Sequence, residues 1–132
     1  MDAYALQNFS RQDLELFISR RYIDATTRDV LEKIIDLKSR MASTDARIQA
    51  IDKEAAEIGE DQQRLRDNIK ALTATAEAKQ LIARYVSKAD TQETRLDQLN
   101  KDKRASQEER VRLQGELEAL IRGLNIDRTL TQ

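Results

Sequence analysis

The sequence contains no cysteine and no histidine, and these two absences remove several classes of chemistry together. Without cysteine there is no disulfide and no thiol nucleophile, and without histidine there is no imidazole for acid–base catalysis or zinc binding. We therefore expect neither a cofactor nor a metal site. The absence of cysteine fits both the cytoplasm and the periplasm, so it leaves the compartment open.

Proline is also absent, and the 132 residues include only three glycines and 4% aromatic side chains. A sequence without proline and with little glycine can maintain helical i→i−4 hydrogen bonds over long stretches. The few aromatic residues disfavour a thick globular core, whereas a narrow seam between helices needs less apolar material. No apolar run is long enough to span a bilayer, and no signal peptide is recognisable.

The 23 basic and 24 acidic residues are interspersed and leave a net charge of −1. Nucleic-acid binding relies on clustered Lys and Arg side chains, which an even mixture of charges does not supply. The basic residues of the second half alternate with acidic ones, as expected for the exposed face of a coiled coil rather than for a phosphate track. They are Lys101, Lys103, Arg104, Arg110 and Arg112.

Two stripes of mostly apolar residues recur in alternating steps of three and four, a period of about 3.5 residues that predicts left-handed supercoiling of helices. The first comprises Val30, Ile34, Leu37, Met41, Thr44, Ile48, Ile51, Ala55, Ile58, Gln62, Leu65, Ile69 and Leu72. The second comprises Ile82, Tyr85, Ala89, Gln92, Leu96, Leu99, Lys103, Ser106, Arg110, Leu113, Leu117, Leu120 and Leu124.

Residues 73–75 separate the stripes, and Thr75 predicts the N-cap of a second helix. Gly123 predicts the C-terminus of that helix. We expect arms over residues 25–72 and 76–123 within a hairpin domain of residues 25–124, an N-terminal segment of residues 1–24 and a tail of residues 125–132. So short a turn makes the helices antiparallel neighbours, with Ile51 opposite Leu99. The expected fold is all-α, a long antiparallel two-helix coiled-coil hairpin.

A short N-terminal helix is expected to pack at the open end of this hairpin. Ser10 and Asp13 resemble a capping box, and the helix that follows presents Leu14, Phe17 and Ile18 on one face. Four apolar residues lie beside the stripes near that end and would be covered by this helix. They are Leu31, Ile35, Val111 and Ile121.

The middle of the seam is polar, because Thr44 falls opposite Ser106 while Lys103 and Arg110 occupy stripe positions. We expect the two cations to lay their methylenes on the seam and reach water with their charges. A flexible or partner-binding zone is the alternative. Glycines 59 and 115 fall within the arms, and we interpret them as tolerated surface substitutions rather than as points of close approach or bending.

The end next to the turn carries apolar residues off the seam. Leu81 and Val86 flank Ile82 and Tyr85, and an exposed apolar patch there would contact a partner or a second copy. The alternative is that these are apolar residues of a fraying helix end without a role. In the N-terminal segment, Phe9 and Phe17 are further candidate partner contacts. Acidic neighbours such as Glu60 and Asp61 lack the desolvating cleft that a catalytic pair needs, so we expect no enzyme and no small-molecule substrate.

Residues 60–85, EDQQRLRDNIKALTATAEAKQLIARY, resemble a segment of uncharacterised bacterial proteins. In that family a β-rich domain of unknown function, similar to one in mucoidy-inhibitor-type proteins, precedes a C-terminal helical hairpin. The similarity extends from about Leu14 onward, but Thr73 and Ala76 stand where the family has Gly and Pro. The resemblance implies a hairpin with no enzymatic activity and no known ligand. It agrees with the opening MDAYALQNFS, which is typical of a segment cut from a longer protein.

These patterns favour a non-enzymatic structural or protein-interaction module, a coiled-coil arm that spaces or self-associates. Its expected partners are a second copy, as a homodimer, or the remainder of its own parent protein. The alternative is a nucleic-acid-binding helical arm of the seryl-tRNA-synthetase type, which would need a one-sided basic face.

Overall fold

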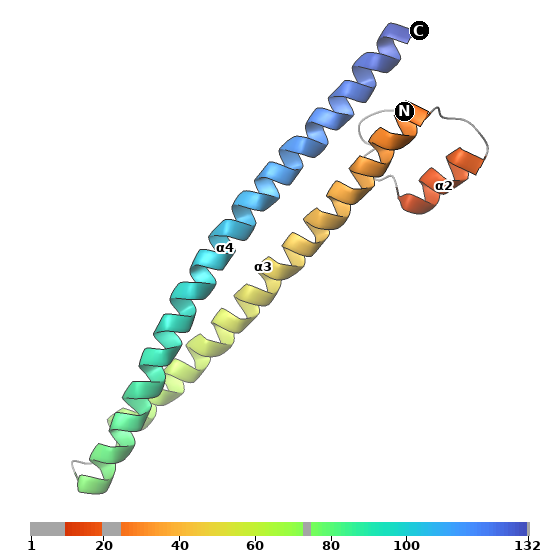
Figure 1. Ribbon diagram of the computed structural model, residues 1–132. Helices are drawn as coiled ribbons and strands as arrows, with labels where there is room; N and C mark the ends of the chain where they lie inside the picture. The colour runs from red at the N-terminus through yellow and green to blue at the C-terminus, as the bar shows by residue number, and fades with distance from the viewer. Residues whose placement is uncertain (1–9, 20–24, 73–74, 132) are drawn as a thin grey trace. The chain divides into compact units, whose positions relative to one another are not determined.

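The structure, a computed structural model, describes residues 10–19, 25–72 and 75–131, without the side chains of residues 14, 17–19 and 125–131. Its helices are α2 (Arg11–Ser19), α3 (Ala25–Ala71) and α4 (Ala76–Thr131), shown in Figure 1. No strand occurs in these described ranges. The predicted all-α fold is therefore confirmed, with two long helices that pack together as a helical hairpin.

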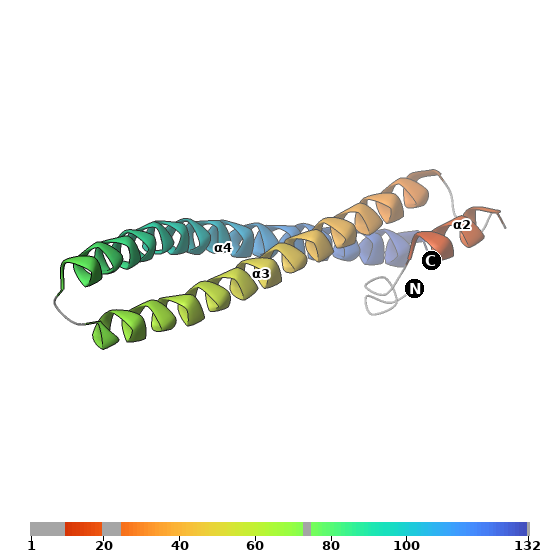
Figure 2. The ribbon, with the colours of Figure 1, turned by 90° about the horizontal axis from the view of Figure 1, so that it is seen from below.

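The chain divides into two compact units, and both long helices run through both of them. The terminal unit comprises Met1–Asp45 and Glu108–Gln132, and the turn unit comprises Ala46–Gln107. Within the turn unit, α3 and α4 lie side by side, as Figure 2 shows. The two units are described separately below.

The start of α2 has the predicted capping box. The backbone N–H of Asp13 donates to Ser10 Oγ at 3.1 Å, and the backbone N–H of Ser10 donates to Asp13 Oδ2 at 3.2 Å. Asp reaches back to the cap as the more usual Glu would, so two N–H groups without helical partners are satisfied reciprocally. The N-terminal segment of residues 1–24 therefore contains the expected short helix.

The connection between the long helices is closed by hydrogen bonds on both sides. At the end of α3, Leu72 N–H donates to the carbonyl of Ile69 at 3.3 Å, a tightened last turn. At the start of α4, Thr75 Oγ1 accepts from the backbone N–H of Ala78 at 3.1 Å. Thr75 is thus the predicted N-cap, and Glu77 follows in the first turn, where the helix dipole favours an acidic residue.

The predicted end of the second arm at Gly123 is wrong, because α4 continues through Thr131. Gly123 does not adopt the left-handed conformation of a helix C-cap, and the tail expected at residues 125–132 is helical as far as residue 131. A single glycine costs a helix only about 1 kcal/mol relative to Ala, which is too little to end it when no proline follows. The first arm ends at Ala71, close to the expected boundary.

Every position of the two predicted stripes is buried or half-buried. In the terminal unit, five stripe residues and the neighbouring Leu31 and Ile121 form a hydrophobic core that half-buried apolar side chains flank. The core residues are Leu31, Ile34, Leu37, Met41, Leu113, Leu117 and Ile121. In the turn unit the buried apolar residues are Ile51, Leu65, Ala78 and Leu99. Burial therefore follows the heptad pattern in each unit.

The apolar residues beside the stripes had mixed outcomes. Leu31 and Ile121 are buried as expected, and Ile35 is half-buried. Val111, however, is 72% exposed, so the prediction that it would be covered is wrong. At about 100° per residue, Val111 lies farther around α4 from Leu117 than Ile121 does, beyond the side of the helix that faces the core.

The glycines within the arms have open space around them, since a Cβ built at Gly59 or Gly115 meets no atom within 4 Å. Close approach of a neighbour is therefore excluded as their role among the described residues. We predict that Gly115→Ala raises the free energy of unfolding by about 1 kcal/mol, because Ala loses less backbone entropy in a helix. Urea titration followed by circular dichroism measures this change. A lower stability of the variant would contradict the prediction and would mean that glycine is required there.

Candidate functional site

The predicted contact residues near the turn are only partly exposed. Leu81, Ile82 and Tyr85 are half-buried, whereas Val86 is 54% exposed. Among these four side chains only Val86 is exposed, so the other three offer a partner less apolar surface. Partner binding at these four residues stays a prediction.

The other two candidates cannot be placed in the same way. Phe9 lies outside the described residues, and Phe17 lies in α2 but its side chain is not described. On the same helix Leu16 is 48% exposed.

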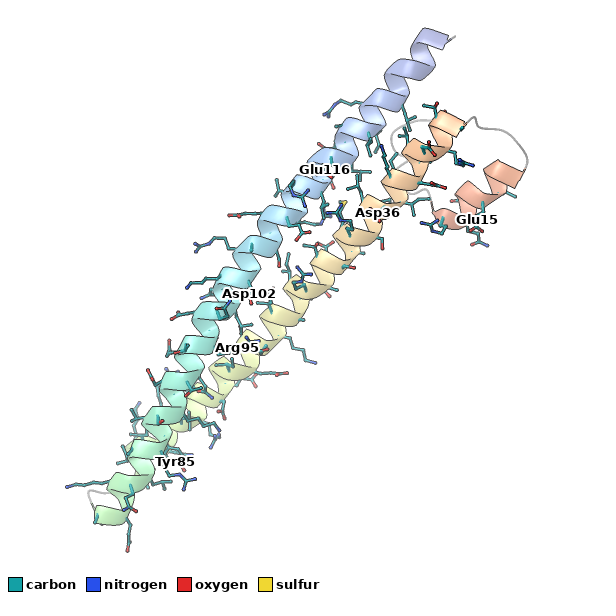
Figure 3. The ribbon with its side chains drawn as sticks, viewed as in Figure 1. Glu15, Asp36, Tyr85, Arg95, Asp102 and Glu116 are labelled. Carbon is teal, nitrogen blue, oxygen red and sulfur yellow. The ribbon has the colours of Figure 1, made fainter. Side chains whose placement is uncertain are left out.

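Charged and amide side chains join α3 to α4 along the turn unit. Arg95, labelled in Figure 3, donates from Nε and Nη2 to the two carboxylate oxygens of Glu54 at 2.5 and 3.0 Å. Such a two-pronged Arg–carboxylate contact adds geometric specificity to charge attraction. Lys103 Nζ lies 2.6 Å from Asp52 Oδ1. These contacts tie specific turns of one helix to specific turns of the other.

The two glutamines of the stripes make a second group of contacts between the helices. Gln92 Nε2 donates to Asp61 Oδ2 at 2.5 Å, and Gln62 Nε2 donates to Glu93 Oε1 at 2.7 Å. Gln92 Oε1 is buried without a hydrogen-bond partner in the described part of the chain. This polar layer therefore contributes less to stability than an apolar layer would, but it disfavours a shifted alignment of the helices.

The cations of the polar mid-section lie along the seam and keep part of each side chain in water, as expected. Lys103 and Arg110 are half-buried, and both meet a carboxylate of α3. Arg110 Nε donates to Asp45 Oδ1 at 2.9 Å within the terminal unit. The buried Thr44 satisfies its hydroxyl by donating to the carbonyl of Arg40 at 2.9 Å. The cations occupy predicted stripe positions, whereas their acidic partners flank the stripe on α3 and were not predicted.

Ion pairs also involve the basic residues of the second half of the sequence. Arg112 contacts Glu116 at 2.6 Å and Glu109 at 3.9 Å, in addition to the pairs made by Lys103 and Arg110. A phosphate-binding track needs cations that are available to neutralise phosphate groups. Carboxylates already neutralise these three, which favours the interpretation of a charge-laced coiled-coil face.

Two carboxyl groups of the turn unit have altered acidity. Hydrogen bonding from Arg95, followed by its charge, lowers the pKa of Glu54. Hydrogen bonds from Arg64 and then Gln92 lower the pKa of Asp61, and the nearby charge of Lys88 adds to this. The pKa of Arg95 is raised, mainly by its hydrogen bond to Glu54. All three groups are thus held in their charged forms.

We predict that acid weakens the turn unit through these two carboxylates. Their pKa values are lower in the folded than in the unfolded chain, so their stabilisation is complete above the ordinary values near pH 4. It is lost as pH falls through the folded-state values. Urea unfolding measured from pH 6 to pH 2 should give a smaller loss of stability for Glu54→Gln combined with Asp61→Asn than for the wild type.

The matched control for this experiment is Glu57→Gln. Glu57 is exposed on α3 and has no ion pair in the described residues. This variant should keep the wild-type dependence of stability on pH. If the double variant also kept it, the two ion pairs would not contribute to folding.

A groove of about 440 Å³ lies between α3 and α4 in the terminal unit. Its apolar lining comes from Leu37, Ala119 and Leu120, and charged side chains form its walls. Figure 3 labels two of these, Asp36 on α3 and Glu116 on α4. The complete lining is Lys33, Asp36, Leu37, Arg40, Glu116, Ala119 and Leu120. The groove was not predicted from the sequence, although charged residues alternate with the stripe on both helices and could have indicated it.

The described residues contain neither a candidate metal site nor a candidate membrane span. No group of three or more acidic side chains is arranged to hold a metal ion in the described ranges. None of the helices α2, α3 and α4, within the residues described, is long and apolar enough to cross a membrane.

Comparisons with protein-family models, curated proteins and solved structures gave no match for this chain. The resemblance of residues 60–85 to bacterial proteins with a mucoidy-inhibitor-type domain therefore stays a prediction from the sequence. The candidate functional features are the interhelical ion pairs, the apolar residues near the turn and the groove of the terminal unit.

Proposed function

We propose that this chain is a non-enzymatic protein-interaction module, an antiparallel coiled-coil arm that self-associates or spaces the parts of a larger bacterial protein. The observation that carries the proposal is the burial of both predicted stripes. The first runs from Val30 in α3 to Leu72, the residue after that helix, and the second from Ile82 to Leu124 in α4. Two facing stripes of this period are the defining feature of a coiled coil.

The order of the interhelical pairs supports antiparallel packing. In the turn unit, Glu93 bonds Gln62, Arg95 bonds Glu54 and Lys103 bonds Asp52. Partner numbers on α3 fall as those on α4 rise, as they do when two helices run in opposite directions. In the terminal unit, Arg110 bonds Asp45. Flanking ion pairs of this kind select the orientation and alignment of coiled-coil helices.

A third helix at the core of the terminal unit is supported by two burial values. Leu31 is 1% exposed and Ile121 is 3% exposed, although both lie beside the stripes rather than on them. Two helices alone cover the facing stripes, but they leave the flanking positions partly open to water. We propose that α2, which belongs to this unit, covers them and makes the unit a small three-helix bundle.

The acidity of the carboxylates supports a structural rather than a catalytic role. A general acid that works near neutral pH needs a raised pKa, obtained by burial or by a neighbouring like charge. Glu54 and Asp61 have lowered pKa values because cations and amides bind them. Together with a sequence that contains no Cys and no His, this leaves pairing as the role of these side chains.

Sedimentation equilibrium tests the self-association in this proposal. A two-helix seam leaves the outer faces of both helices unpaired, and two hairpins can form a four-helix bundle. Because such an association follows mass action, the average mass should rise from one chain towards two between low and high micromolar concentration. A mass of one chain throughout this range would contradict self-association.

A further inference from the structure

We propose that the groove of the terminal unit is the surface on which a second copy of this chain docks. The inference rests on the proposed function, because it assumes a self-associating arm. It names the surface and the partner, which the proposed function leaves open. Three features of the groove carry it: its apolar lining, its charged walls and the area of the face to which it belongs.

The groove follows one flank of the seam on both helices. On α3, residues Lys33, Leu37 and Arg40 are spaced by four and three, so they lie along one side of the helix. On α4, Glu116 and Leu120 have the same four-residue spacing. The apolar strip between the walls therefore runs parallel to the helices. A second pair of helices can pack along such a strip.

The opposite flank of the seam is closed. Leu31 and Ile121 lie on it and are almost fully buried. On the groove flank Leu120 is only half-buried and Ala119 is exposed. Val111 is also exposed but lies farther around α4, away from the seam. Next to the seam, the groove flank is therefore the side on which apolar surface of the terminal unit is available to a partner.

The two walls differ in charge. The α3 wall carries Lys33, Asp36 and Arg40, and these side chains make no ion pair among the described residues. The α4 wall carries Glu116, whose carboxylate contacts Arg112 of the same helix at 2.6 Å. One wall thus has a surplus of positive charge, and the other presents the carboxylate of Glu116, whose side chain is 45% exposed.

These walls are complementary under a two-fold axis that runs along the groove. A half-turn about this axis exchanges the positions of the two walls. The α3 wall of each copy therefore faces the α4 wall of the other. Lys33 and Arg40 of each copy then approach Glu116 of its partner. An interface of this kind is self-complementary, as two-fold dimers require, and opposite charges meet twice.

The face is large enough for a specific dimer. The α3 part of the terminal unit, residues 25–45, is about 30 Å long at 1.5 Å per residue. Two helices about 10 Å in diameter make a face of roughly 600 Å². Burying this face on both copies removes about 1,200 Å² from water, which is within the range of specific interfaces. By contrast, of the four apolar side chains predicted to contact a partner near the turn, only Val86 is exposed.

Charge-reversal variants of the full chain test the docking surface. The first variant combines Lys33→Glu with Arg40→Glu, and the second carries Glu116→Lys. Each variant alone sets like charges against each other in both contacts. The dissociation constant of its dimer should therefore be about tenfold or more higher than that of the wild type. An equimolar mixture of the two should restore the association, since every α3 wall then faces an α4 wall of opposite charge.

Sedimentation equilibrium of the wild type, of each variant and of their mixture is the measurement. Val86→Lys is the matched control, and its dimer should equal that of the wild type. Circular dichroism melting shows whether the reversals unfold the chain. If they do, Lys33→Gln with Arg40→Gln replaces the first variant and should weaken the dimer less.

The outcomes separate this inference from the proposed function. A wild-type dimer that both reversals leave unchanged, or a mixture that does not restore association, overturns the groove as the docking surface while self-association stands. A wild type that stays monomeric overturns self-association itself. Weakening by each reversal together with recovery in the mixture is the result that we expect.

Discussion

Leu113→Ala should lower the free energy of unfolding by about 3 kcal/mol, within the range of about 2–5 kcal/mol measured for buried Leu→Ala substitutions. Leu113 is 0% exposed and belongs to the core cluster of the terminal unit. The loss combines the removal of apolar surface from a water-free site with the cavity that remains, because neighbouring helices relax only partly. Urea denaturation followed by circular dichroism measures it.

Val111→Ala is the matched control for this experiment. It lies on the same helix, two residues before Leu113, but is 72% exposed. Removing two methyl groups from an exposed side chain should change stability by less than about 0.5 kcal/mol. Equal losses for the two variants would mean that the stripe around Leu113 does not form the core.

Leu31→Ala should also cost about 3 kcal/mol, provided that α2 covers this residue. The test is a double-mutant cycle with Phe17→Ala. If the two side chains belong to one packed cluster, the cost of Leu31→Ala should be smaller in the chain that already lacks Phe17. Contacting residues couple by about 0.5–3 kcal/mol in such cycles, and we expect a value in that range.

A second cycle supplies the control. Phe17→Ala combined with Leu65→Ala pairs α2 with the turn unit, where Leu65 is buried in the seam. Residues that share no packed cluster usually give additive effects, within about 0.5 kcal/mol. Additivity in both cycles would exclude α2 as the cover of Leu31 and leave the terminal unit without its proposed third helix.

Much of the fold could be predicted from the sequence because its main signals are local or periodic. Stripes with a period of about 3.5 residues identify the buried side of each helix, whichever partner covers it. The caps at Ser10 and Thr75 depend on residues three positions away, so the sequence shows them directly.

The parts that the sequence did not predict depend on contacts between helices. Val111 was expected to be covered but is exposed. Whether a residue beside a stripe is buried depends on where a third helix packs, and local sequence patterns do not specify that position. The carboxylates of Asp45 and Asp52 find cations more than fifty residues away, so no spacing rule connects them.

The predicted end of α4 failed for a different reason. Gly123 is a frequent helix terminator, yet its effect is statistical and small compared with the sum of the hydrogen bonds that continue the helix. The groove likewise forms only where the flanks of both helices come together. In the sequence, the residues of its walls have the same pattern as any exposed charged residues of a helix.

Double electron–electron resonance on the turn unit tests antiparallel pairing, the central claim, most directly. The chain has no native cysteine, so two introduced cysteines label it uniquely. Lys53→Cys with Gln98→Cys and Ala46→Cys with Ala105→Cys place labels on exposed residues expected at the same level. Because packed helix axes lie about 8–10 Å apart, both pairs should give short distances of roughly 20–30 Å.

A third pair, Lys53→Cys with Lys79→Cys, provides the contrast. Residue 79 lies about 28 Å along α4 from residue 98, at 1.5 Å per residue, so this distance should be clearly longer than the other two. Two short distances and one long distance are the result that antiparallel pairing predicts. Long distances for the first two pairs, or a short distance for the third, would contradict it.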